Sequence, residues 1–215
     1  MIRAVISDFG GVLTTPLLES FVAYQRESGI AFEELGAAMA RVAAAHGGEH
    51  PLFELEKGNL SEDEFIGRLE GELGRKMGSF RDTYFAHLHP NQRMIGYMRE
   101  LKGRGLRMAL LTNNVREWEP IWRAKLPDID EIFEVVVDSA FVGMRKPEPE
   151  IYELTLERLG DGLQPGECVF LDDIEANCDA ASTLGMHAVR FADNDQAIAD
   201  IETVVGDGRP GDDAG

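Results

Sequence analysis

A chain of 215 residues is long enough to bury a substantial core, as one large domain or as a core with an insertion. Its formal net charge of −18 at pH 7 disfavours nucleic acid and anionic membrane surfaces as partners, because both are bound mainly through basic side chains. No apolar run approaches the ~20 residues that a membrane-spanning helix needs, and the short apolar stretch after Met1 is expected to be a strand rather than a cleavable signal.

The chain opens and continues with segments typical of a buried parallel sheet. Residues 2–7 are almost continuously apolar instead of alternating, which indicates a strand covered on both faces. Four more such runs follow Pro90, at residues 106–111, 133–137, 168–171 and 188–191. Helical patterns separate them, one of which begins at Pro149, a residue favoured in the first turn. This alternation predicts an α/β fold with a doubly wound, Rossmann-like parallel-sheet core.

The sequence between the first two predicted strands has a different character. Apolar side chains recur at helical spacing around Leu17 and Phe21, and again around Leu35 and Met39. Ser61 to Glu64 has the pattern of a capping box, which marks the start of a further helix. No convincing strand pattern occurs here, so the segment is predicted to be helix and turn throughout.

These patterns predict a core interrupted by an insertion. The core comprises residues 1–14 and 89–205, and residues 15–88 form a helical cap inserted after the first strand. Residues 206–215 are rich in Gly, Asp and Pro and are predicted to be a disordered tail. Because the insertion follows the end of a strand, the cap is expected to lie above that edge of the sheet.

Six polar residues lie at or just beyond the ends of apolar runs. They are Asp8, Thr112, Asn113, Lys146, Asp172 and Asp173. The carboxyl ends of parallel strands meet at one edge of a sheet, and open α/β sheets bind their ligands there. Carboxylates, a hydroxyl and an amine that meet at one edge indicate a site for phosphate and a metal ion.

Each of these residues also has a purely structural interpretation. Asp8 can act as a nucleophile that forms an aspartyl-phosphate or as a metal ligand, but an aspartate there can equally cap a loop. Thr112 and Asn113 can hold phosphoryl oxygens through a hydroxyl and backbone N–H groups, or cap a helix. Lys146 can neutralise charge on a phosphoryl group, or remain a solvated loop lysine.

The adjacent acids Asp172 and Asp173 favour a metal site. Two neighbouring carboxylates repel each other unless a cation lies beside them. A set of carboxylate and carbonyl oxygens suits Mg²⁺ better than Zn²⁺. Acids at the start of a helix are also favoured by the helix dipole, which explains one of the pair more easily than both.

The order of four segments along the chain resembles one protein superfamily. The segments are Ala4 to Val12, Leu110 to Asn113, Arg145 to Pro149 and Val169 to Asp173. Together they resemble the haloacid dehalogenase-like superfamily of phosphatases and phosphotransferases. Residues 146–190 are particularly similar to the N-terminal phosphatase domain of soluble epoxide hydrolases and to the related domain attached to some acyl-CoA dehydrogenases. The resemblance extends over residues 1–192, with the insertion matching in position and length rather than in motif.

The resemblance implies a Mg²⁺-dependent hydrolase of small phosphorylated metabolites. Asp8 would attack phosphorus, Thr112 would bind the phosphoryl oxygens, and Lys146 would balance the charge. Mg²⁺ would be held by Asp8, by the backbone carbonyl of Gly10 and by Asp173. Asp172 would lie close to the metal or just behind its ligands, and the helical insertion would be a cap that closes on the substrate.

Gly10 departs from the pattern of the family's phosphatases. They have an aspartate at this position, two residues after the nucleophile, which protonates the leaving group and later activates water. General acid–base help is worth roughly 10²–10⁴-fold, so its loss should be felt unless another group replaces it. Possible substitutes in this sequence are His46, His50, Asn114 and Glu54.

Three functions remain open on the sequence. The leading one is the phosphomonoester hydrolase; a non-catalytic phosphate- or metabolite-binding protein is the second. The third is a haloacid dehalogenase, which also lacks the acid, but it needs no Mg²⁺ and would leave the retained acid pair unexplained.

The remaining expectations concern the cellular location, the oligomeric state and the residues that line a substrate pocket. Cys168 and Cys178 lack the spacing of a zinc or disulfide framework, so we expect core thiols in a cytoplasmic protein. The chain is expected to be a monomer or a homodimer. Four aromatic residues of the cap are candidates for a substrate pocket, although helical spacing more often indicates a core: Phe21, Tyr24, Phe53 and Phe65.

Overall fold

The computed structural model describes residues 1–206 and contains one five-stranded parallel sheet. Its strands are β1 (Ala4–Ser7), β2 (Arg107–Thr112), β3 (Val135–Asp138), β4 (Cys168–Asp172) and β5 (His187–Arg190). They lie in the order β3-β2-β1-β4-β5, and every neighbouring pair is parallel. The predicted α/β fold is therefore confirmed, and each strand agrees with its predicted position to within a few residues.

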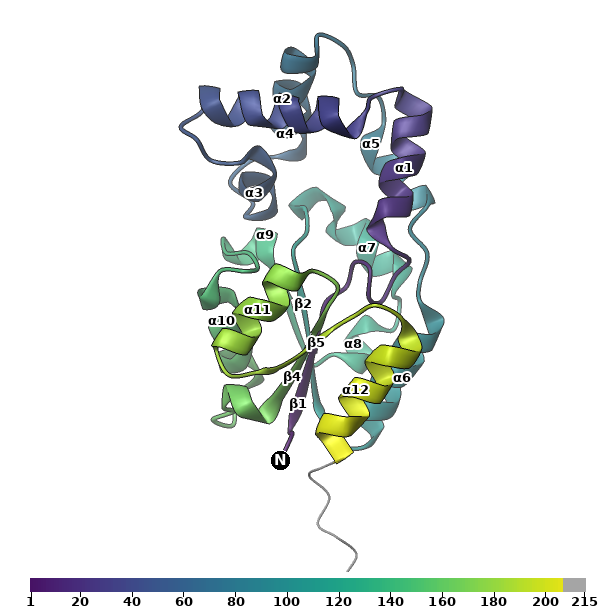
Figure 1. Ribbon diagram of the computed structural model, residues 1–215, viewed down its shortest axis with the longest axis vertical. Coiled ribbons are helices and arrows are strands. Elements are labelled where there is room, and N and C mark those ends of the chain that lie inside the picture. The colour runs from purple at the N-terminus through teal and green to yellow at the C-terminus, as the bar shows by residue number, and fades with distance from the viewer. Residues whose placement is uncertain (207–215) are drawn as a thin grey trace, which may run out of the picture.

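Helices cover both faces of the sheet (Figure 1). The helices within residues 92–206 are α6 (Gln92–Gly103), η1 (Arg116–Trp118), α7 (Glu119–Lys125), α8 (Ile129–Ile132), α9 (Ser139–Val142), α10 (Pro149–Leu159), η2 (Pro165–Glu167), α11 (Glu175–Thr183) and α12 (Asn194–Gly206). The side chains of β1 alternate between two hydrophobic clusters, with Val5 in the cluster of α6 and α12, and Ala4 and Ile6 in that of α10. Burial on both faces explains the continuous apolar pattern of this strand. Pro149 begins α10 as predicted.

Five further helices lie between β1 and α6, above the carboxyl ends of the strands (Figure 1). They are α1 (Leu17–Ser28), α2 (Phe32–Ala45), α3 (Pro51–Glu56), α4 (Glu62–Leu73) and α5 (Phe80–Ala86). The predicted capping box is present at the start of α4, where Ser61 and Glu64 bond each other's backbone N–H groups. Among the described residues, no part of this segment joins the central sheet.

Two chain segments connect these five helices to the sheet, and they run side by side. Thr14 and Pro90 form an isolated antiparallel bridge. Thr15 N–H donates to the carbonyl of His89 at 2.8 Å, and Asn91 N–H donates to the carbonyl of Leu13 at 2.9 Å. The helical unit thus enters and leaves through one short hydrogen-bonded stem.

The C-terminal end of the described chain is helical. Gly206, the first residue of the predicted disordered tail, is instead the last residue of α12. The rest of that prediction, residues 207–215, lies outside the described residues. No helix within residues 1–206 is long and apolar enough to cross a membrane.

Candidate active site

Asp8 lies where β1 gives way to a tight glycine loop. Its backbone N–H donates to the carbonyl of Leu171 on the neighbouring strand at 2.8 Å, which fixes the start of the loop against β4. Gly11 follows with φ of +78°, a left-handed conformation that favours glycine. A Cβ atom at Gly11 would lie 2.3 Å from Asp173 Oδ2. The bare glycine therefore lets the first loop approach the acid pair at the end of β4.

The ammonium group of Lys146 joins two of the predicted carboxylates. Its Nζ lies 2.7 Å from Asp8 Oδ1 and 2.6 Å from Asp172 Oδ2. Lys146 is 1% exposed and Asp172 is fully buried, so Lys146 is not a solvated loop lysine. The Asn177 amide donates to both Asp172 oxygens, at 3.0 and 3.1 Å, and Ile174 N–H donates to Oδ1 at 2.8 Å. Asp172 is thereby fixed beneath the other acids.

Asn113 positions the backbone of Lys146. Its side-chain Oδ1 accepts the Lys146 N–H at 2.8 Å, and its Nδ2 donates to the Lys146 carbonyl at 2.9 Å. Both ends of the amide are therefore engaged with the backbone of the lysine. Thr112, the last residue of β2, is buried and lines the same cavity as Asp8 and Lys146.

The electrostatics of this cluster are unbalanced. Three carboxylates, those of Asp8, Asp172 and Asp173, face a single ammonium group. Burial raises the pKa of Asp8 to about 7, against the opposing pull of Lys146, and the neighbouring Asp172 and Asp173 raise it further. Burial is also the main cause that raises the pKa of Asp173, followed by the charge of Asp172. Negative charge without a matching cation is costly in such a place.

The residues present fit a divalent metal ion. Carboxylate oxygens of Asp8, Asp172 and Asp173 lie within 4.8 Å of one another. Asp173 Oδ1 is buried and has no hydrogen-bond partner among residues 1–206. These are hard oxygen ligands of the type that Mg²⁺ prefers. A dication would also balance the excess negative charge of the cluster.

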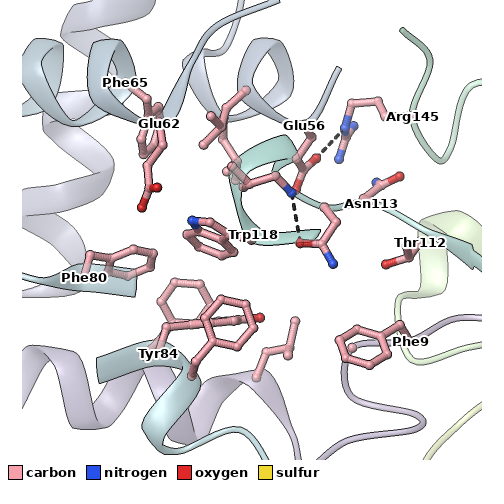
Figure 2. Close-up of a pocket in the computed structure, with 18 of the residues that line it drawn as sticks. Phe9, Glu56, Glu62, Phe65, Phe80, Tyr84, Thr112, Asn113, Trp118 and Arg145 are labelled. Atoms are coloured by element: carbon pink, nitrogen blue, oxygen red, sulfur yellow. Dashed lines mark hydrogen bonds and ion pairs between the residues drawn. The ribbon is translucent and has the colours of Figure 1, made fainter. Parts of the chain in front are cut away.

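The cluster forms the floor of a cavity of about 200 Å³, which is lined by residues at the strand ends and by residues of all five helices α1 to α5. Of the predicted site residues, Asp8, Gly10, Thr112, Asn113, Lys146 and Asp173 line this cavity. Asp172 does not line it, because it lies buried under Lys146. Figure 2 shows Phe80, Tyr84 and Trp118 on one side of the cavity, and Thr112 and Asn113 on the other.

Two charged residues next to the cluster, Glu56 and Arg145, were not among the predicted site residues. Arg145 Nε lies 2.7 Å from Glu56 Oε2, and both side chains line the cavity (Figure 2). Burial raises the pKa of Glu56, while Arg145 acts against this rise. Helical periodicity from Pro51 places Glu56 on the same face as Leu52, four residues earlier, and that spacing is the signal that could have identified it.

The proposed substitutes for the missing acid are mostly outside the cavity. His46, His50 and Glu54 do not line it, so the structure places these three outside the space that Asp8 faces. His46 Nδ1 bonds the carbonyl of Val42 at 2.9 Å, and Glu54 accepts a hydrogen bond from Asn59. The His50 ring packs against Phe53 with a centroid distance of 4.7 Å.

The fourth proposed substitute does line the cavity. Asn114 is in the lining, but its side-chain oxygen already accepts the Val115 N–H at 2.9 Å. The four aromatic residues suggested for a substrate pocket also differ in position. Phe21 and Phe65 line the cavity, whereas the Tyr24 hydroxyl donates to the carbonyl of Met77. Phe53 instead packs under the guanidinium group of Arg145 at 3.9 Å.

Comparison with known proteins identifies relatives across most of the chain. A mouse acyl-CoA dehydrogenase family member 10 is 30% identical over 213 residues, which is 95% of this chain but 19% of the mouse protein. The chain thus spans about a fifth of that relative. A sesquiterpene phosphatase of Aspergillus oryzae is 27% identical over 217 residues, covering 95% of this chain and 97% of the fungal protein.

Solved structures show the same fold. A HAD family enzyme from Bacteroides thetaiotaomicron, in complex with magnesium and inorganic phosphate, superposes with a TM-score of 0.70 at 21% identity. The match covers 93% of this chain and 99% of that one. The sequence model of the haloacid dehalogenase-like hydrolase family matches residues 2–185. The chain therefore belongs to the haloacid dehalogenase-like hydrolase family.

Proposed function

We propose that this hydrolase is a Mg²⁺-dependent phosphomonoesterase of small phosphorylated metabolites that works through an aspartyl-phosphate on Asp8. The observation that carries the proposal is the buried Lys146 ammonium group between Asp8 and Asp172, on the floor of a cavity. Asp173 lies beside it with a buried oxygen that has no hydrogen-bond partner in the described part of the chain. The relatives that are named phosphatases support the same reaction class.

Asp8 supplies the nucleophile in this mechanism. A carboxylate oxygen of Asp8 forms a bond to phosphorus while the ester P–O bond breaks and its electron pair leaves with the alcohol oxygen. Water then attacks phosphorus and releases inorganic phosphate, which restores the carboxylate. Lys146 Nζ, 2.7 Å from Asp8 Oδ1, keeps the nucleophile oriented and offsets charge on the phosphoryl oxygens. Thr112 and the backbone N–H of Asn113 complete the proposed phosphate site.

Asp8, the Gly10 carbonyl and Asp173 would hold Mg²⁺, with Asp172 just behind them. The ion would supply positive charge to the phosphoryl oxygens and bring the substrate to Asp8. Removing one proposed ligand tests this set. Asp173→Ala should abolish Mg²⁺-dependent turnover, whereas Asp179→Ala, which removes an exposed carboxylate from α11, should leave it intact. Full activity of Asp173→Ala would make the ligand assignment wrong.

We also propose that residues 15–88 act as a cap on a core formed by residues 1–14 and 89–205. The single stem at Thr14 and Pro90 supports this division, because one hinge point suits opening and closing. Closure would bring Glu56 of α3 to Arg145 in the loop that carries Lys146. Exclusion of water by the closed cap would protect the aspartyl-phosphate until hydrolysis.

The decisive experiment is a panel of phosphomonoesters assayed for phosphate release. Wild type should turn over part of the panel with Mg²⁺ and lose this activity in EDTA. Asp8→Asn should be inactive under both conditions while its circular dichroism spectrum remains unchanged. Phosphate binding without turnover by the wild type would instead favour the non-catalytic alternative. Halide release from a 2-haloacid, independent of Mg²⁺, would favour the dehalogenase.

We also propose a cellular location, a class of partner and an oligomeric state for the protein. Cys168 and Cys178 are both buried and unpaired, which supports a reducing cytoplasmic location. The net charge of −18 supports small molecules rather than nucleic acid or membrane surfaces as partners. We propose a monomer or a homodimer.

A further inference from the structure

The cavity changes character within a short distance of its floor. The floor carries the carboxylates and Lys146, but the walls provided by the five helices are mainly apolar. Five aromatic side chains of these helices form much of this lining, and Trp118 of η1 lies beside them: Phe21, Phe65, Phe80, Tyr84 and Phe85. Of the carboxylates on those walls, Glu56 is paired with Arg145 and Glu62 with Arg81. Apart from the buried Trp118 Nε1–H, which has no hydrogen-bond partner among residues 1–206, the walls therefore offer few free polar groups to the part of a substrate beyond its phosphate.

Five of these aromatic side chains, all except Phe65, form a continuous wall. Ring centroids lie 5.8 Å apart for Phe21 and Tyr84, 5.2 Å for Tyr84 and Trp118, and 5.3 Å for Phe85 and Trp118. Phe80 joins the same group at 5.9 Å from both Phe21 and Trp118. Such rings favour stacked and edge-on contacts with another planar apolar group. A sugar phosphate, whose hydroxyls need partners, would lose hydrogen bonds against this wall.

A second observation concerns the missing acid. A Cβ atom at Gly10 would lie 3.2 Å from both Cδ atoms of Leu17, the first residue of α1. An apolar side chain thus crowds the space that a side chain at Gly10 would enter. Gly10 itself does not have a positive φ, so its backbone does not require glycine. Where the family's phosphatases present a carboxylic acid, this cavity presents the isobutyl group of Leu17.

Two other groups near the floor are possible proton donors, and an ion pair or a high pKa disfavours donation by each. Glu56 accepts a hydrogen bond from Arg145 at 2.7 Å, and this ion pair opposes the rise in the pKa of Glu56 that burial causes. Burial raises the pKa of Tyr84 well above its usual range, and the charge of Asp8 adds to this rise. The leaving oxygen therefore receives little help from protonation. That arrangement suits an alcohol that is already a stable anion when it departs.

From these two observations together we propose that the substrate is the phosphate monoester of an apolar phenol. The aromatic body would lie against Phe80, Tyr84 and Trp118 while its phosphate reaches Asp8. When the ester P–O bond breaks, the electron pair leaves on a phenolate, which delocalises the charge over its ring and takes its proton from water. The inference rests on the proposed phosphomonoesterase function and specifies its substrate class.

Matched substrates separate the two parts of the proposal. Naphthyl and naphthylmethyl phosphates present similar apolar bodies, but only the first leaves as a phenolate. We expect kcat/KM for naphthyl phosphate to exceed that for naphthylmethyl phosphate by about 10²-fold or more, the scale of missing acid catalysis. Naphthyl phosphate should also exceed phenyl phosphate, and glycerol phosphate should be the poorest. Equal rates for the naphthyl and naphthylmethyl esters would overturn the leaving-group argument.

Glu56→Gln and Tyr84→Phe test the two alternative donors. Each should leave the ratio between naphthyl and naphthylmethyl phosphates unchanged, because neither group donates a proton. A selective loss of the naphthylmethyl reaction in either variant would identify that residue as the acid and overturn the proposal. The ratio is informative even if a variant binds substrate more weakly, since both esters use the same cavity.

A binding measurement keeps this inference separate from the proposed reaction. Calorimetry on Asp8→Asn with Mg²⁺ should give at least tenfold tighter binding of naphthylmethylphosphonate than of methylphosphonate. Phe80→Ala should reduce that preference, whereas Phe141→Ala, at an exposed residue outside the cavity, should not. Equal binding of the two phosphonates would overturn the apolar substrate class. Preferential binding without turnover of any ester by the wild type would support the apolar site and refute the hydrolase.

Discussion

The carboxylate of Asp173 packs directly against the Cα of Gly11. A side chain at Gly11 would place its Cβ 2.3 Å from Asp173 Oδ2 and 2.9 Å from the carboxylate carbon. This contact sets the separation between the Asp8 loop and the end of β4, the two elements that carry the acid cluster. The distance between proposed metal ligands therefore depends on a residue that contributes no side chain.

Substitution of Gly11 by alanine should weaken metal binding. Gly11→Ala must displace Asp173 in addition to straining a backbone with φ of +78°. We expect the Kd for Mg²⁺, measured by calorimetry, to rise at least tenfold. Gly29→Ala is the matched control, because Gly29 has φ of +68° and no neighbour within 4 Å of a new Cβ. An equal loss of Mg²⁺ affinity in both variants would contradict the role of the Gly11 contact.

The side chain of Asn113 should affect the reaction only through Lys146. Its amide bonds both the N–H and the carbonyl of Lys146, so Asn113→Ala frees the loop that places the ammonium group. We expect kcat to fall at least tenfold in the wild-type background. The same substitution should cost little when Lys146 is already methionine, because the group that it positions has gone. Phosphate-release kinetics of both single variants and the double variant provide the measurement. Fully additive losses would argue for a separate contact between Asn113 and the substrate.

The missing acid should be recoverable once Leu17 is reduced in size. Gly10→Asp alone brings its Cβ within 3.2 Å of the Leu17 methyl groups, so the new side chain competes with Leu17 for space. Gly10→Asp combined with Leu17→Ala should raise hydrolysis of an alkyl phosphate by about 10-fold or more, within the range of general acid catalysis. The gain should shrink for an aryl phosphate, whose leaving group needs little protonation.

Leu17→Ala alone is the control for that experiment. It enlarges the cavity without adding an acid and should not change the ratio between alkyl and aryl esters. The folded state of each variant is checked by thermal unfolding before kinetics. A double variant that accelerates both esters by the same factor would show that the new carboxylate does not protonate the leaving group.

Asp138 should make the protein less stable as pH rises. Burial raises its pKa from 3.8 to about 6, although its carboxylate accepts the Ala140 N–H. Between these values the native state binds more protons than the unfolded state, so this group's contribution to stability is complete below pH 3.8 and lost by about pH 6. Asp138→Asn keeps the hydrogen-bond acceptor without the charge. At pH 7 it should therefore be more stable than wild type by about 1–3 kcal/mol.

Urea unfolding at pH 4 and pH 7 measures this effect. The stability difference between Asp138→Asn and wild type should be present at pH 7 and nearly absent at pH 4. Asp193→Asn is the matched control, since Asp193 accepts the Gln196 N–H at 2.9 Å in an exposed position and should show little change. A gain that is the same at both pH values would mean that the buried charge is not its cause.

Local patterns were sufficient to predict much of the architecture. The continuous apolar run before Asp8 identified β1, because a strand buried on both faces needs no alternation. Ser61 and Pro149 marked helix starts through bonds and dihedral preferences that act within one turn. The strand ends also placed the polar residues correctly at one edge, since parallel strands share a direction.

Contacts between distant residues decided what the sequence left open. Glu56 and Arg145 are 89 positions apart, and only the packing of α3 over the sheet brings them together in the cavity. His46 and His50 carried the right chemistry for an acid or base, but the packing of their helices directs them elsewhere. Periodicity tells which face of a helix is apolar, but not which neighbour that face meets. The sequence by itself therefore determined the sheet and its acidic edge. Tertiary packing decided that Leu17 lies against Gly10 and that aromatic rings enclose the space above Asp8.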